Sequence, residues 1–156
     1  MEIEKPIIRI TVNPAVKKYL EIKFGKKYTL CTDQWFGIMI YNFLLYKTNK
    51  DFKITPKIRD QKDFFEVIIS QNQAEKAGIS LTEKQEASIN NIVEKILREE
   101  IYYAAILNKK LYMIDYRITI NNILDSYDIT EEDLPFDTLI KEFDRKKNSL
   151  TEKLYL

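Results

Sequence analysis

In the first 46 residues, polar and apolar positions alternate first with the period of a strand and then with the period of a helix. Residues 7–12 are short and β-branched, which predicts a strand with one apolar face and one face carrying Arg9 and Thr11. A helix pattern follows, with Pro14 in the first helical position and Gly25 at the C-terminal stop. The opening order is therefore strand and then helix.

A second helix is predicted from about residue 33 to residue 46. It is apolar almost all round, which is typical of a core or of a dimer interface. After a polar loop, residues 52–58 contain Pro56 and form an edge strand at best. Residues 64–70 predict a stronger strand with apolar side chains on both faces, so we expect both of its faces to be covered.

The longest predicted helix lies in the middle of the chain. Residues 71–78 form a connector, and two capping boxes then follow, Ser80-x-x-Glu83 and Thr82-x-x-Gln85. Apolar residues recur at helical spacing from about Thr82 to Leu107, and the polar residues 108–110 are expected to break this helix.

The C-terminal third predicts two shorter helices. Residues 111–118 are ambiguous between extended and helical structure, and Thr119 can cap a short helix after them. An acidic turn then leads into an amphipathic helix from about Pro135 to Lys147. The apolar tail, residues 150–156, either packs on the protein's own core or docks onto a partner.

Together these patterns predict an α+β fold that is mostly helical. It has a small sheet, an N-terminal β-α-α block, one long central helix and a C-terminal pair that resembles a helix-turn-helix. We expect an α+β core domain over residues 1–110 and a helical subdomain over residues 111–156. The 3 glycines and 4 prolines among 156 residues suit long regular elements with few tight turns.

Charge is distributed unevenly along the chain. Residues 1–60 contain 12 Lys and Arg against 6 Asp and Glu, a net charge of +6, whereas residues 61–156 contain 13 against 18, a net charge of −5. A basic N-terminal third suits a polyanion. The alternative is that the opposite charges pair within the fold.

Catalytic chemistry has little support in the sequence. The absence of histidine excludes Ser-His and Cys-His pairs, and the glycines do not match a phosphate-binding loop. The acidic residues are typical of helix caps and solvated helix faces. Cys31 has no neighbouring base to activate it, which favours a structural cysteine. We expect no enzyme, no cofactor and no metal.

The same features predict where the protein acts. One cysteine fits a reducing compartment, and the N-terminus lacks the pattern of a signal peptide. The apolar stretch of residues 35–46 is too short to span a bilayer. We therefore expect a cytoplasmic protein with no membrane partner.

The N-terminal block contains the first candidate nucleic-acid interface. The outward strand positions carry side chains that hydrogen-bond base edges in the major groove, and nearby lysines can contact phosphates. The alternative is an α+β core whose lysines compensate a helix C-terminus. The candidate residues are Arg9, Thr11, Lys17, Lys18, Lys26 and Lys27.

This strand-helix-helix order over about 40 residues resembles the ribbon-helix-helix family. The resemblance implies DNA reading by a β-ribbon in the major groove, with two chains pairing their strands and the second helix forming the dimer core. The chain departs from the family by continuing into the strand at residues 64–70. If that strand pairs with residues 7–12 within one molecule, it covers the edge that a dimer needs.

The last predicted helix carries the second candidate interface. Its exposed side offers basic residues for a groove or for phosphates, although Asp137, Glu142 and Asp144 share the helix and Glu142 can pair with Lys146. The candidate residues are Lys141, Arg145, Lys146 and Lys147.

Residues 80–148 resemble small proteins encoded by phages and mobile elements of gut Bacteroidales, in which a long helix precedes an acidic turn and an aromatic-basic helix. The resemblance implies a DNA-associated regulatory, replication or packaging role in the host cytoplasm. We expect duplex DNA and a second copy of the chain as partners, with other phage proteins possible. The alternative is a structural or assembly protein of the virion that does not read DNA.

Overall fold

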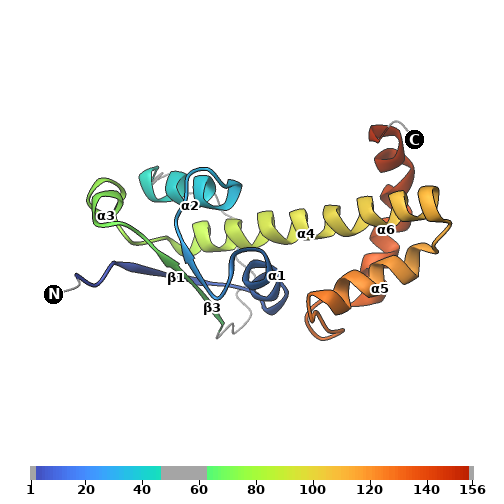
Figure 1. Ribbon diagram of the computed structural model, residues 1–156, viewed down its shortest axis with the longest axis horizontal. Helices are drawn as coiled ribbons and strands as arrows, with labels where there is room; N and C mark the ends of the chain where they lie inside the picture. Colours follow the sequence, from blue (N-terminus) through green and yellow to red (C-terminus); the bar gives the residue numbers. More distant parts are fainter. Residues whose placement is uncertain (1–2, 47–62, 155–156) are drawn as a thin grey trace. The chain divides into compact units, whose positions relative to one another are not determined.

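The computed structural model describes residues 3–46 and 63–154 of the chain (Figure 1). The predicted edge strand at residues 52–58 and the last two residues of the apolar tail lie outside these ranges. Within the described part the protein is mostly helical with one small sheet and one long helix, so the predicted fold class is confirmed.

The chain divides into two compact units. Among the described residues, unit 1 consists of residues 3–13, 20–46 and 63–91, and unit 2 of residues 14–19 and 92–154. Helix α1 (Pro14–Phe24) and helix α4 (Glu83–Tyr112) therefore each contribute residues to both units. The predicted domain ranges, 1–110 and 111–156, stay a prediction.

Unit 1 is built on a three-stranded sheet with β3 in the centre. Strand β3 (Phe64–Ile68) pairs antiparallel with β1 (Ile7–Thr11) and parallel with β2 (Lys27–Thr29). Strand β2 was not predicted, because three residues are too few to show an alternating pattern. It lies between the two N-terminal helices in the sequence.

An aromatic cluster fills the core of unit 1. Phe36, on α2 (Trp35–Leu45), is fully buried, with its ring centroid 5.2 Å from that of Phe24, 5.4 Å from that of Tyr28 and 5.7 Å from that of Phe65. Only one side of α2 is buried, because Trp35 and two other large apolar residues of the helix are 39–45% exposed. The prediction that this helix lies in the core therefore holds for one of its faces.

Gly37 fixes how closely α2 approaches the loop before it. A Cβ atom at this position would lie 1.9 Å from the carbonyl oxygen of Cys31 and 2.7 Å from Tyr28 Oη. The Tyr28 hydroxyl donates to that same Cys31 oxygen at 3.3 Å. Only a residue without a side chain allows this contact.

The helix boundaries follow their local capping signals. Pro14 and Gly25 delimit α1 as predicted, and Gly25 has a φ of 84° with its N–H bonded to Glu21 O at 2.9 Å. Of the two predicted capping boxes, Thr82 and Gln85 form one, with reciprocal bonds of 3.0 and 3.1 Å. Helix α3 (Gln71–Ala77) occupies the predicted connector and has a capping box of its own, headed by Ser70.

Unit 2 packs three helical segments and the first turns of α1 around an apolar core. Helix α5 (Tyr116–Ser126) and helix α6 (Phe136–Lys153) follow α4 (Figure 1). Leu150, the first residue of the predicted apolar tail, is buried within α6. Side chains from all of these elements form the core, namely Val16, Leu97, Ile101, Ile120, Leu139 and Phe143.

Two predicted boundaries in unit 2 are wrong. The polar residues 108–110 do not break α4, which continues to Tyr112 because asparagine and lysine in a helix cost little free energy when the flanking positions stay helical. Thr119 does not cap α5. The cap is Asp115, whose carboxylate accepts the N–H of Arg117 at 2.9 Å, and Thr119 is buried one turn into the helix.

The carboxylate of Glu142 holds α4 and α6 together. It accepts hydrogen bonds from Tyr102 at 2.7 Å and from Lys146 at 2.6 Å, and it also pairs with Arg98. The Lys146 contact is the predicted pair one turn apart on α6. Burial disfavours the charged form of Glu142, but these three donors outweigh it and lower the pKa from 4.5 to about 2.

A second carboxylate, that of Glu100, accepts hydrogen bonds from two tyrosines. Glu100 accepts the hydroxyl of Tyr19 from α1 at 3.0 Å and the hydroxyl of Tyr127 from the end of α5. The two tyrosine rings also contact each other, with centroids 5.4 Å apart. Burial, together with the bond to Glu100, raises the pKa of Tyr19 well above its ordinary value. Tyr19 therefore remains a neutral donor at physiological pH.

In the described part of the chain, no helix combines the length and the apolar character that crossing a bilayer requires.

Gly37→Ala is expected to destabilise unit 1 by about 2 kcal/mol, since the methyl group overlaps the main chain of Cys31 and forces the backbone to move. Thermal or urea unfolding measures the change. Asn42→Ala, on the exposed side of the same helix, is the matched control and should stay within about 0.5 kcal/mol of the wild type. Equal stability of Gly37→Ala and the control would contradict the close approach.

Glu142→Gln is expected to lower the stability of unit 2 at pH 7 by about 2 kcal/mol, because two charge-assisted hydrogen bonds are lost. The folded pKa lies below the ordinary value, so Glu142 contributes stability above about pH 4.5 and loses it as the pH falls toward 2. Urea titrations from pH 7 to about pH 3 should therefore show a smaller acid loss in the variant than in the wild type. Glu99→Gln, at an exposed site on α4, should retain the wild-type profile.

Candidate nucleic-acid interface

One face of the unit 1 sheet is buried and the other is open. Ile8 and Ile10 on β1 and Val67 on β3 point into the core, each at most 3% exposed. Because side chains alternate along a strand, their neighbours point the other way. On the open face lie Ile7, Arg9 and Thr11 from β1, Lys27 and Thr29 from β2, and Phe64, Glu66 and Ile68 from β3.

The strand register places two cations on either side of one carboxylate. Arg9 and Lys27 both lie opposite Glu66, one on each neighbouring strand. Arg9 Nε is 3.4 Å from Glu66 Oε1, and the arginine side chain is 70% exposed. Exposed pairs of this kind contribute about 0–1 kcal/mol, so a phosphate can compete for the guanidinium. The row has a net positive charge.

An aromatic side chain lies beside this row. Phe64 is 48% exposed and lies opposite Thr11 in the register. The expectation that both faces of this strand are covered is therefore wrong. A strand with apolar residues on both faces can be covered on both, or it can leave an aromatic ring exposed on one. The sequence pattern is the same in both cases, because burial depends on what packs against each face.

The end of β1 is capped by side chains from α4. The N–H of Thr11 donates to Glu86 Oε2 at 2.6 Å, and its carbonyl accepts Asn90 Nδ2 at 2.8 Å. Asn90 Oδ1 also accepts the N–H of Asn13 at 2.7 Å. The amide of Asn90 is buried, and both of its polar atoms have partners.

This cap limits strand pairing at the outer edge of β1. The N–H of Val12 donates to the carbonyl of Asp63, and the N–H of Ile69 donates to the carbonyl of Pro6. The N–H and C=O groups of the even-numbered residues along β1 therefore face β3. The odd-numbered groups face outward, and those of Thr11 are taken by α4. A ribbon formed with a second copy would use the outward groups of Ile7 and Arg9.

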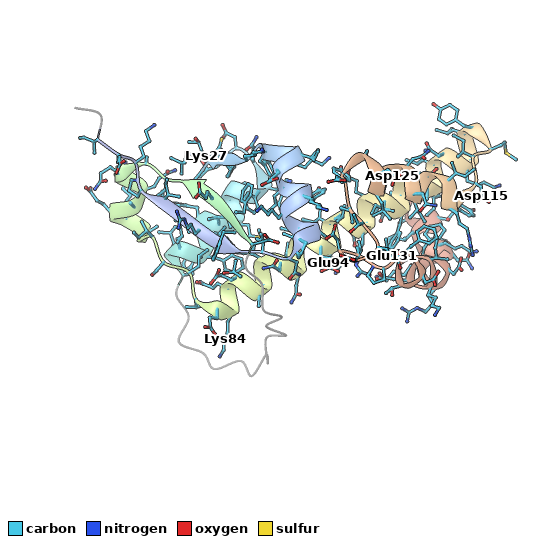
Figure 2. The ribbon with its side chains drawn as sticks, turned by 90° about the horizontal axis from the view of Figure 1, so that it is seen from below. Lys27, Lys84, Glu94, Asp115, Asp125 and Glu131 are labelled. Carbon is cyan, nitrogen blue, oxygen red and sulfur yellow. The ribbon has the colours of Figure 1, made fainter. Side chains whose placement is uncertain are left out.

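Lys26 and Lys27 follow the end of α1 and are exposed. In the part of the chain that the structure describes, neither forms an ion pair. Figure 2 shows Lys27 on the surface of unit 1. Both lysines can therefore contact phosphates, although they also lie near the negative end of the α1 dipole.

Lys17 and Lys18 belong to unit 2 and differ from the other N-terminal candidates. Lys18 Nζ donates to Asp133 Oδ2 at 2.7 Å and to the carbonyl of Asp128 at 2.6 Å, with 29% of its side chain exposed. Burial disfavours ionised Asp133, but the hydrogen bonds from Lys18 and from Thr130 together outweigh it and lower the pKa of Asp133. Lys17 is half-buried. The predicted N-terminal residues are thus divided between the two units.

The basic residues of α6 are divided as well. Lys146 pairs with Glu142, and Lys147 lies 3.5 Å from Asp144 and 5.9 Å from the ring centre of Tyr116. Lys141 and Arg145, one turn apart, are exposed and form no ion pair among the described residues. The second candidate interface therefore consists of two available cations.

Residues 3–46 and 63–154 contain no group of three or more cysteine, aspartate or glutamate side chains placed to hold a metal. Cys31 is half-buried, and its N–H and carbonyl both lie within hydrogen-bond reach of the Tyr28 hydroxyl at 3.3 Å.

The open sheet face unites three residues that the sequence proposed, Arg9, Thr11 and Lys27, with two that it missed, Phe64 and Glu66. The alternation in residues 64–70 places Phe64 and Phe65 on opposite faces of the strand. This pattern could have identified Phe64 as a residue of the open face.

The chain matches no protein-family model, and comparison with curated proteins and with solved structures finds none that is similar to it.

Proposed function

We propose that the protein binds duplex DNA through the open face of its sheet, as a small regulator of transcription, replication or packaging in a phage or mobile element. On this proposal it acts in the cytoplasm of the host cell. The observation that supports it most directly is the row of Arg9 and Lys27 around Glu66, which gives one exposed sheet face two cations and one anion.

The chemistry of the neighbouring residues fits this ligand. Arg9 presents a planar guanidinium that hydrogen-bonds guanine edges or phosphates, and Thr11 offers a hydroxyl beside it. Lys26 and Lys27 supply point charges for the backbone. Phe64 adds an apolar surface that can contact a thymine methyl group.

Binding should depend on salt, because phosphate contacts release counterions. With Arg9, Lys26 and Lys27 each contacting one phosphate, the slope of log K against log salt is expected to be about −3. The double variant Arg9→Glu/Lys27→Glu should weaken binding at least about tenfold and reduce the slope by about 2. Fluorescence anisotropy with a labelled duplex measures both quantities.

The control is Lys141→Glu/Arg145→Glu, which changes the net charge equally but on α6. Its affinity should stay within about threefold of the wild type. If this variant loses binding and the sheet variant does not, α6 is the reading element instead. No binding of the wild type at about 50 mM salt would reject the proposal altogether.

Glu66→Gln is expected to tighten DNA binding several-fold. The substitution removes the one carboxylate of the row and releases Arg9 from its 3.4 Å ion pair. Because the pair is exposed, the stability of the fold should change by less than about 1 kcal/mol. Weaker binding by a stably folded Glu66→Gln protein would place the DNA elsewhere.

A further inference from the structure

The end of helix α4 exposes three consecutive large apolar side chains. Leu111, Tyr112 and Met113 are 63%, 68% and 76% exposed, and Ile118, on the first turn of α5, is 54% exposed. Figures 1 and 2 show that the connection from α4 to α5, which carries Asp115, lies at the outer end of unit 2. Residues 109–118, here named the α4–α5 tip, therefore project apolar side chains into solvent, which is typical of an interaction surface.

The backbone at Met113 favours a smaller residue than the one it carries. Met113 has a φ of 59°, in the left-handed region that favours glycine. Its N–H donates to the carbonyl of Lys109 at 3.1 Å, which ends α4. The end of α4 is also tied to α5, because Asn108 Nδ2 donates to Thr119 Oγ1 at 3.3 Å. Glycine would suit this turn better, so the methionine side chain is displayed at a cost to the fold.

The α4–α5 tip has a positive border. Residues 109–118 contain Lys109, Lys110 and Arg117 against the single carboxylate of Asp115, a net charge of +2. Lys110 and Arg117 are exposed. The carboxylate of Asp115 is engaged as the α5 cap, where it accepts the N–H of Arg117 at 2.9 Å. The cations of the tip are therefore available to an anionic partner.

A tyrosine ring of the tip positions two ammonium groups. Lys109 Nζ from α4 and Lys147 Nζ from α6 each lie 5.9 Å from the ring centre of Tyr116. The ring packs on the buried Phe143, with centroids 5.1 Å apart. Lys147 also lies 3.5 Å from Asp144, which offsets part of its charge. Positive charge from two helices is thus held at the tip by contacts within the fold.

An anionic lipid surface matches this combination of groups. Aliphatic side chains enter the acyl boundary of a bilayer, tyrosine favours the headgroup level, and lysine and arginine contact anionic headgroups. A folded protein would have to offer a preformed apolar socket, whereas lipids rearrange around a projecting side chain. A nucleic acid would use the cations and Tyr112 but would leave Leu111 and Met113 in water. A lipid surface therefore accounts for both the apolar and the charged groups.

We propose that the α4–α5 tip inserts reversibly into the surface of anionic phospholipid bilayers. Leu111 and Met113 enter the acyl boundary to a depth of about 5–10 Å, while Lys110 and Arg117 contact headgroup phosphates. Surface insertion needs no spanning segment. The short apolar stretch of residues 35–46, from which we expected no membrane partner, therefore does not exclude it. This inference is independent of the proposed DNA binding, which uses unit 1.

Vesicle co-sedimentation of the full chain without DNA tests the proposal. The wild type should bind vesicles of phosphatidylcholine that contain about one third phosphatidylglycerol, and at least about tenfold more weakly vesicles of phosphatidylcholine alone. Raising the salt from about 0.1 M to about 1 M should weaken the binding, because the screening length falls from about 10 Å to about 3 Å.

A pair of charge variants on α4 locates the contact. Lys110→Glu should weaken binding to the anionic vesicles about tenfold, because a cation of the tip becomes an anion facing anionic headgroups. Lys95→Glu, at an exposed site on the same helix, makes the same charge change away from the tip and should bind like the wild type.

A further variant separates lipid binding from folding. Met113→Gly relieves the left-handed backbone, so its thermal midpoint should be equal to or above that of the wild type. Its binding to the anionic vesicles should fall about tenfold, because an apolar side chain no longer inserts.

Three results would overturn the proposal. The first is a wild type that does not bind the anionic vesicles at low salt, or that binds the neutral vesicles equally well. The second is vesicle binding by Lys110→Glu or Met113→Gly at the wild-type level. The third is a loss of DNA affinity in Lys110→Glu without any vesicle binding by the wild type, which would assign the tip to nucleic acid.

Discussion

The main-chain pairing of β3 with two strands is the constraint on which the candidate interface depends. Its antiparallel register with β1 and parallel register with β2 decide which side chains share a face. Because Phe65 and Val67 must be buried, Glu66 must point outward, and the register then brings Arg9 and Lys27 to either side of it. The charge of the open face is thus a consequence of hydrogen bonds that involve none of these side chains.

The two units use polar side chains in different ways. In unit 2, Glu142 and Glu100 each collect several donors, and these bonds link helices that are far apart in the sequence. Lys18 serves the same purpose at the turn before α6. In unit 1, by contrast, the basic residues on the sheet remain exposed. A lysine count along the chain therefore overstates the charge available to a polyanion, since part of it stabilises the fold.

The open sheet face stays exposed after the core is formed. It combines the cations of Arg9 and Lys27 with hydrogen-bonding groups, which fits a polyanion. Leu111, Tyr112 and Met113 at the end of α4 are exposed as well, but they offer an apolar surface rather than a charged one.

The sequence by itself determined the class of the fold, the helices other than α3, and the signals that begin and end α1 and begin α4, because periodicity, proline, glycine and capping boxes act over a few residues. Pro14, Gly25 and the Thr82–Gln85 box are all in place. The three residues of β2, the open face around Phe64 and the capped edge at Thr11 needed the tertiary structure. Each depends on partners 39 to 79 positions away in the chain, such as Asn90 for Thr11, and a pattern of neighbouring residues does not reveal such distant pairing.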